Sequence, residues 1–186
     1  AAVCAIELGI CPTLIAKAIS SITGIEGRME KIKLRPDIGF SVFIDYAHTP
    51  DALENVLKTL REIAPDRELI CLFGCGGDRD RSKRPEMAAI AQKLADRIVV
   101  TSDNSRTEKT ADIMADIKEG MDTSGKAKSL FIEDREQAIR TAIMIADEGA
   151  TILLAGKGHE TYQIIGTEKL HFDEKEIVMN ITREMI

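Results

Sequence analysis

The sequence lacks the features that would place it in a specialised class. Its 186 residues contain no Trp and only two Tyr and five Phe. With 44% hydrophobic and 30% charged residues, its composition is ordinary for a globular protein, which argues against disorder and against a fibrous repeat. A chain of this size buries about 70% of its unfolded surface, so it needs no disulfide staples. The length fits one domain, or one domain with part of another.

Neither an excess of positive charge nor a long apolar run is present. The 31 acidic residues outnumber the 25 basic ones, and the net charge of −6 argues against a protein that binds nucleic-acid backbones. The longest apolar runs, Ala150–Gly156 and Glu68–Gly74, are strand-sized, whereas a membrane span needs about 20 residues. No signal peptide is recognisable. We therefore expect a cytoplasmic protein with no nucleic-acid or membrane partner.

The cysteines also lack a functional pattern. Cys4, Cys11, Cys71 and Cys75 form no C-x-x-C pair, and His48 has no metal-ligand spacing to them. Structural thiols in a reducing compartment are the simplest interpretation. No metal site is predicted.

The first residues differ in pattern from the rest. The chain begins with Ala, and helical spacing of apolar residues predicts helices over Ala1–Leu8 and Thr13–Ile22, with Pro12 at the start of the second. Two such helices cannot bury their own apolar faces. We therefore expect a chain cut from a longer protein. A different pattern begins at Gly27.

From there onward, strand-like and helix-like segments alternate. Strands are predicted at Met29–Leu34, Gly39–Asp45, Glu68–Gly74, Arg97–Thr101, Lys128–Phe131 and Thr151–Ala155, and helices at Asp51–Ile63, Pro85–Ala95, Ala111–Met121 and Asp134–Asp147. A hairpin over Tyr162–Leu170 and a last helix from Asp173 follow. This alternation predicts an α/β fold with a mostly parallel sheet and helices on both faces.

Ligands of such sheets bind in the loops at the carboxyl ends of the strands, and four of these loops are rich in Gly and charge. The run from Gly74 to Gly77 is no dinucleotide loop, because G-x-G-x-x-G would require Gly where Arg79 stands. Arg79 and Arg106 suit a carboxylate or phosphate, whereas Asp103 and Glu160 suit an ammonium group. Together the four side chains match a zwitterionic ligand.

A further loop carries Asp45 and His48 at a strand end. His48 could act as a general base, as a hydrogen-bond donor to phosphate or ribose, or as a helix cap. The residues leave these three roles open.

Five stretches together resemble the Mur ligases. They are GRME (27–30), DYAHTPDAL (45–53), GCGGDRDRSKRPEMA (74–88), DNSR (103–106) and AGKGHE (155–160), in the order and at the spacing of that family. The resemblance implies a Rossmann-like C-terminal domain over residues 27–186, preceded in residues 1–26 by the last helices of a central ATPase domain. The P-loop of that ATPase, and the lysine that the family carbamylates to hold Mg²⁺, do not occur in this sequence.

The resemblance also implies an activity. In the family, ATP phosphorylates the D-Glu carboxylate of UDP-MurNAc-L-Ala-D-Glu, the amine of an incoming amino acid attacks the acyl phosphate, and phosphate leaves. The motifs imply that meso-diaminopimelate is held by Arg79, Asp103, Asn104, Arg106, Gly156 and Glu160, and that Arg28, Asp45 and His48 face ATP. ATP and Mg²⁺ would be bound mainly outside this chain. No catalytic residue is assigned here, and the chain alone is expected not to ligate.

One motif departs from the family pattern. The diaminopimelate-adding members usually read DNPR, whereas this chain has Ser105 before Arg106. Lysine-adding members usually lack the arginine, because lysine has no second carboxylate and an unpaired buried guanidinium is costly. Arg106 therefore favours diaminopimelate over lysine. The alternatives are a lysine-adding Mur ligase, a stand-alone binding module, or a folylpolyglutamate or cyanophycin synthetase domain; DNSR together with GKGHE disfavours the last.

Overall fold

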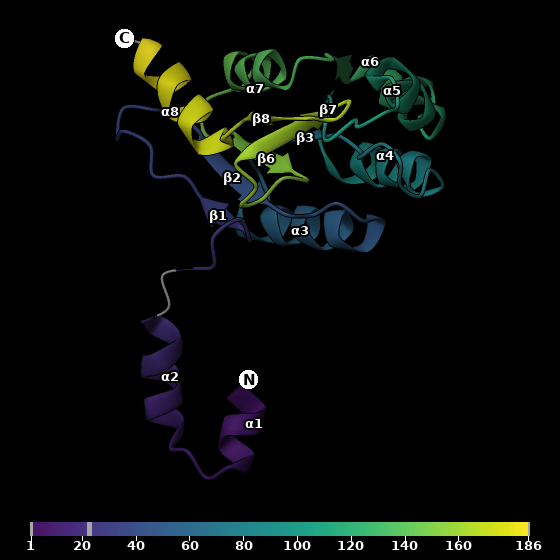
Figure 1. The fold of residues 1–186 in the computed structure, drawn as a ribbon. Coiled ribbons are helices and arrows are strands. Elements are labelled where there is room, and N and C mark those ends of the chain that lie inside the picture. Colours follow the sequence, from purple (N-terminus) through teal and green to yellow (C-terminus); the bar gives the residue numbers. More distant parts are fainter. Residues whose placement is uncertain (1, 22–23, 186) are drawn as a thin grey trace.

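The computed structural model describes residues 2–21 and 24–185, and most of them form a sheet covered by helices on both faces (Figure 1). The strands are β1 (Glu30–Lys31), β2 (Ser41–Asp45), β3 (Leu69–Phe73), β4 (Arg97–Val100), β5 (Ser129–Phe131) and β6 (Thr151–Ala155). Their order is β1-β2-β6-β3-β4-β5, and all neighbours are parallel except β1 and β2. The predicted α/β class and mostly parallel sheet are confirmed.

Two hydrophobic clusters pack on opposite faces of this sheet. Helices α3 (Pro50–Ile63), α4 (Lys83–Leu94) and α5 (Thr110–Glu119) cover one face, and α7 (Arg135–Met144) and α8 (Glu174–Glu184) cover the other. Strand β3 shows why: Cys71 and Phe73 join the first cluster, and Ile70 and Leu72 the second. Because both faces are covered, every residue of β3 and β6 is buried.

Local sequence explains where several helices begin. Thr49 caps α3 by accepting a hydrogen bond from the amide of Ala52, and Pro50 occupies the first turn. Asp134 and Asp173 cap α7 and α8 in the same way. These caps set the helix starts directly after loops that leave the sheet.

The structure differs from the sequence prediction in two elements. The strand expected over Met29–Leu34 is reduced to Glu30–Lys31, because the chain soon turns at Arg35, whose carbonyl accepts a hydrogen bond from the amide of Ile38. A short helix, α6 (Thr123–Ala127), was not expected. It has only five residues, too few to show a helical period. The predicted hairpin is confirmed as β7 (Tyr162–Ile165) and β8 (Glu168–His171).

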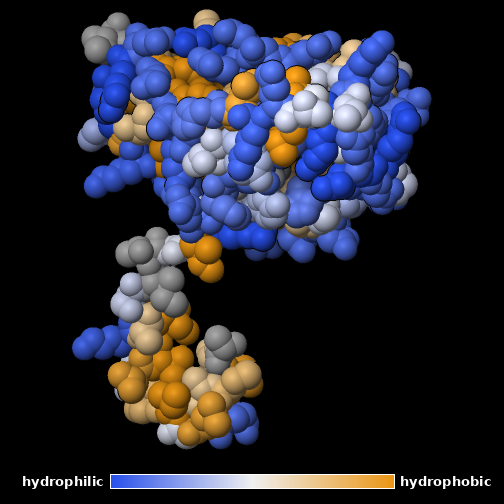
Figure 2. Space-filling model, viewed as in Figure 1, coloured by the Kyte–Doolittle hydropathy of each residue, from blue (hydrophilic) through white to orange (hydrophobic). Residues whose placement is uncertain are grey.

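The first two helices, α1 (Ala2–Glu7) and α2 (Pro12–Ser20), stand apart from the sheet (Figure 1). Neither contains a buried residue, and Figure 2 shows their surface dominated by apolar side chains. Of the expected helix ends, Ala1 and Ile22 lie outside the described residues. The boundary between residues 26 and 27 stays a prediction. No helix in the described part of the chain combines the length and the apolar character of a membrane span.

Candidate functional site

A cavity of about 430 Å³ opens at the carboxyl ends of β2, β3, β4 and β6. Its lining consists of Tyr46, His48, Thr49, Gly76, Arg79, Asp80, Lys83, Asp103, Asn104, Arg106, Gly156 and Glu160. All six residues predicted to hold the amino acid line it, and so does His48. Arg28 and Asp45 do not. The parallel strand order brings these loops, which are far apart in sequence, to one edge of the sheet.

One glycine shows how closely the loops approach each other. Gly156 has φ +115°, and a Cβ there would lie 2.7 Å from a carboxylate oxygen of Asp103. Any side chain would therefore be strained and would push Asp103 out of the cavity. We therefore expect Gly156 to contribute to the site by leaving room for the Asp103 carboxylate.

One side of the cavity carries negative charge; we call Asp103, Asn104 and Glu160 the anion wall. Asn104 donates from Nδ2 to Oε2 of Glu160 over 3.0 Å. Lys157 lies beneath, fully buried, with its Nζ 3.3 Å from Oδ1 of Asn104, 3.5 Å from Glu160 and 3.9 Å from Asp103. Burial lowers the pKa of Lys157. Lys157 therefore partly balances the negative charge of Asp103 and Glu160. The sequence alone did not point to Lys157 as part of the site.

A buried ion pair supports the anion wall from below. Arg135 donates to the carbonyls of Ser102 and Ala155, each over 2.9 Å, and to Oε1 of Glu174 over 2.9 Å. The Arg135 and Glu174 side chains are 0% and 1% exposed, and burial raises the pKa of Glu174. Arg135 thereby fixes the ends of β4 and β6 relative to each other. No local motif distinguishes it from a surface arginine.

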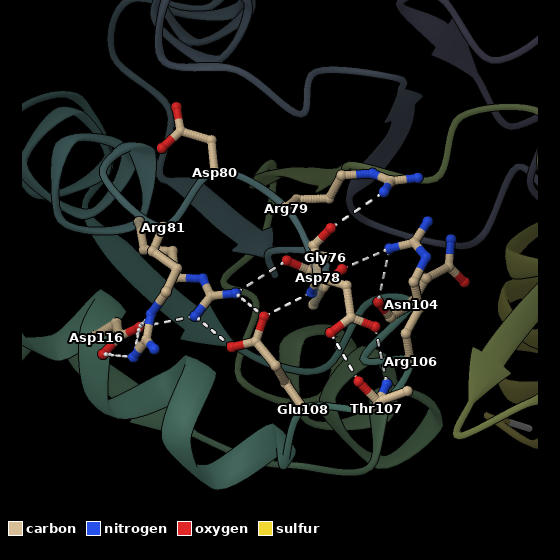
Figure 3. A network of polar contacts seen from close by, with 12 residues as sticks. Gly76, Asp78, Arg79, Asp80, Arg81, Asn104, Arg106, Thr107, Glu108 and Asp116 are labelled. Carbon is tan, nitrogen blue, oxygen red and sulfur yellow. Dashed lines mark hydrogen bonds and ion pairs between the residues drawn. The ribbon is translucent and has the colours of Figure 1, made fainter.

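Two arginines give the cavity positive charge as well; we call Arg79 and Arg106 the cation wall (Figure 3). Nη1 of Arg106 donates to the carbonyls of Gly77 and Asn104, over 2.9 Å and 3.2 Å. Nη1 of Arg79 donates to the carbonyl of Asp78 over 3.1 Å. In the described part of the chain both guanidiniums bind backbone carbonyls and neither pairs with a carboxylate. They are therefore able to accept an anionic ligand.

The residues predicted to face ATP are only partly brought together. The guanidinium of Arg28 lies 5.0 Å from the ring centre of Tyr46, whose ring is 4.6 Å from that of His48. Nδ1 of His48 lies 2.8 Å from the carbonyl oxygen of Tyr46. Asp45 instead is buried and accepts the amide hydrogen of Met29 over 2.7 Å. This hydrogen bond holds the backbone at Met29, where φ is +44°, and Asp45 does not line the cavity.

Comparison with known proteins gives one consistent family. Residues 27–158 match the family described as "Mur ligase, glutamate ligase domain". UDP-N-acetylmuramoyl-L-alanyl-D-glutamate–2,6-diaminopimelate ligase from Trichormus variabilis is 54% identical over 92% of this chain and 34% of its own length. The enzyme of the same name from Fusobacterium nucleatum is 47% identical over 98% and 37%. A solved structure of a ligase of that name has a TM-score of 0.79 at 38% identity, covering 99% of this chain and 37% of its own. The chain thus spans about a third of the length of the curated relatives it matches.

Proposed function

Because this chain belongs to the Mur ligase family, we propose that it is the amino-acid-binding part of a cytoplasmic, ATP-dependent ligase that adds meso-diaminopimelate to UDP-MurNAc-L-Ala-D-Glu. In this reaction ATP phosphorylates the D-Glu carboxylate. The amine of diaminopimelate then attacks the acyl carbon, an amide bond forms and phosphate leaves. This chain binds the amino acid and orients its amine.

The observation that carries the proposal is that carboxylates and guanidiniums line the same cavity. The anion wall offers Asp103 and Glu160 to an ammonium group, and the cation wall offers Arg79 and Arg106 to a carboxylate. Diaminopimelate has an ammonium and a carboxylate at each end, so one molecule can use both walls. Lysine has only one carboxylate and would leave guanidinium groups without a partner, which is costly in a desolvated site.

The nucleotide is assigned to the other rim of the cavity. Tyr46 and His48 line the cavity and Arg28 lies against the Tyr46 ring, and these flat and cationic groups together suit a base or a phosphate. Asp45 supports this rim by holding the backbone at Met29. The described residues contain no group of three His, Cys, Asp or Glu side chains placed as metal ligands. As the family resemblance implies, we propose that Mg²⁺ is bound mainly by parts of the full enzyme outside this chain.

The test uses a chimera in which this chain replaces the matching third of the Trichormus variabilis ligase. We expect ATP-dependent product with meso-diaminopimelate and at least about tenfold lower kcat/KM with L-lysine, since a lost charged hydrogen bond costs about 1.5–3 kcal/mol. Arg106→Ala should remove most of this preference. Titration calorimetry of the chain with both amino acids is the companion measurement. Equal affinities that do not depend on Arg106 would contradict the proposal.

A further inference from the structure

A single carboxylate joins the two loops that carry the cation wall. Asp78 lies in the loop after β3, directly before Arg79. Its Oδ2 accepts the amide hydrogen of Thr107 over 3.1 Å, and its Oδ1 accepts the Thr107 hydroxyl over 2.8 Å. Thr107 directly follows Arg106 in the loop after β4. The side chain of Asp78 therefore connects the backbone next to one guanidinium with the backbone next to the other.

The position of Asp78 is itself fixed from behind. Its amide donates to Oε1 of Glu108 over 2.6 Å, and Glu108 receives two further hydrogen bonds from Arg84, of 2.8 and 2.9 Å. Arg84 is fully buried and also donates to the carbonyl of Gly76. The Arg84 guanidinium lowers the pKa of Glu108 to about 2, so this carboxylate stays ionised at neutral pH. Figure 3 shows Glu108 on the opposite side of Asp78 from the guanidinium of Arg106.

Both loops have a strained backbone at the residues concerned. Asp78 has φ +53° and Arg106 has φ +52°, in the left-handed region that non-glycine residues rarely adopt. Such conformations persist only where the surroundings over-determine them. For Arg106, hydrogen bonds from its amide to Ile164 and to its carbonyl from Gly166 supply part of that constraint. The hydrogen bonds between Asp78 and Thr107 add a constraint on the residue that follows Arg106.

From this geometry we propose that Asp78 is a positioning residue that sets selectivity for amino acids with a second carboxylate. It touches no cavity surface itself. By tying the two loops it fixes the separation of the backbone positions from which Arg79 and Arg106 extend, so that both guanidiniums can reach one carboxylate. This inference rests on the proposed function, because it concerns the same cavity and the same substrate.

The test separates the tether from the backbone strain. Asp78→Gly tolerates the left-handed backbone but has no side chain to bind Thr107. Asp78→Asn also tolerates that backbone, and its amide can accept from the Thr107 amide and donate to the hydroxyl. Thr107→Val removes only the hydroxyl hydrogen bond. Arg81→Ala is the matched control, because Arg81 is exposed and pairs with Asp116 in the same charge cluster without touching Asp78.

In the chimera we expect Asp78→Gly to raise KM for meso-diaminopimelate about tenfold, the loss expected for hydrogen bonds to a charged group, with a smaller change in kcat. The kcat/KM for L-lysine should change less than about twofold. Asp78→Asn should restore most of the affinity, Thr107→Val should show a smaller loss in the same direction, and Arg81→Ala should leave the ratio of the two substrates unchanged.

Two results would overturn the inference: a ratio of kcat/KM for the two amino acids that Asp78→Gly leaves unchanged, or an Asp78→Asn variant as impaired as Asp78→Gly. If Asp78→Gly does not fold, an unchanged ratio in Thr107→Val decides against it. If the unsubstituted chimera ligates diaminopimelate and the Asp78 and Thr107 variants keep its preference for diaminopimelate over lysine, the proposed role of Asp78 is contradicted. The proposed function is not affected by that result. An unsubstituted chimera that folds but makes no diaminopimelate product contradicts the proposed function and removes the basis of the inference.

Discussion

The two walls of the cavity are built in opposite ways. The anion wall rests on buried charges: Lys157 lies under Asp103 and Glu160, and Arg135 ties the strand ends below them. The cation wall also has a buried charge behind it, Arg84, but this acts through Glu108, whose side chain is 21% exposed, and through hydrogen bonds between exposed loops. The buried charges therefore contact the anion wall directly, whereas the buried charge behind the cation wall acts through a partly exposed carboxylate.

The two walls also differ in how their charges are balanced. The carboxylates of the anion wall already have a cation within 4 Å, in Lys157. The guanidiniums of the cation wall meet only carbonyl oxygens in the described residues. The guanidiniums of the cation wall are thus available to bind a carboxylate. Stability should depend mainly on the anion wall, and selectivity mainly on the cation wall.

The largest expected effect is on the support of the anion wall. Arg135→Met removes one partner of a buried ion pair, leaving Glu174 uncompensated and two carbonyls unbound, so the free energy of unfolding should fall by about 3–5 kcal/mol. Chemical denaturation of this chain measures the change. Arg140→Met is the matched control, because Arg140 lies on the same helix in an exposed pair with Glu184, for which a loss below about 1 kcal/mol is expected.

A second variant tests whether the uncompensated charge is the cause. Adding Glu174→Leu to Arg135→Met removes both charges, and buried pairs replaced by apolar groups often lose little stability. The double variant should therefore recover part of the loss. If Arg135→Met lowers the free energy of unfolding by no more than the Arg140→Met control, the anion wall does not depend on its buried ion pair. The proposed difference between the two walls is then wrong.

The sequence could predict the sheet and most of the cavity lining for a physical reason. Buried strands are continuous apolar runs, and the charged loops follow them directly, so Arg79, Asp103, Arg106 and Glu160 could be placed at one edge without any structure. Their positions in the cavity agree with that prediction. Their contacts with a ligand stay a prediction.

The supports of both walls could not be predicted in this way. Arg84 meets Glu108 at a separation of 24 residues and Arg135 meets Glu174 at 39. In the sequence, Arg84 and Arg135 are ordinary charged residues near the start of a helix, and most charged residues are exposed. Only the packing of distant elements decides that these two are buried. Asp45 shows the converse, because a motif residue expected to face the nucleotide is bound to the backbone of Met29.

An intermediate effect is expected on the cation wall, and it should depend on pH. Arg84 lowers the pKa of Glu108 to about 2, so its ionised form stabilises the folded state fully above its ordinary pKa near 4.5, and this contribution is lost as the pH falls toward 2. Glu108→Gln should cost about 1 kcal/mol at pH 7, since the site is partly exposed, and less at pH 3. Denaturation of both proteins at the two pH values measures this. A gap that does not narrow would show that ionisation of Glu108 is not what stabilises the loop.

The smallest effect concerns the residue that joins the two walls. Ser105 lies between Asn104 of the anion wall and Arg106 of the cation wall. The resemblance to the Mur ligases implies that diaminopimelate-adding members usually have proline at this position. Within the described residues its amide donates no hydrogen bond, so Ser105→Pro loses no contact of that kind. Proline restricts the unfolded chain, and a compatible site gains about 0.4–1 kcal/mol in the free energy of unfolding.

We therefore expect Ser105→Pro to be neutral or slightly stabilising in denaturation. In the chimera, its ratio of kcat/KM for meso-diaminopimelate and L-lysine should stay within about twofold of the original, below the tenfold step that 1.4 kcal/mol represents. A large loss of stability would mean that the Ser105 backbone is incompatible with proline. A large change in the ratio with stability intact would mean that the two walls are coupled through this residue, and that the positions of the guanidiniums depend on the anion wall as well as on Asp78.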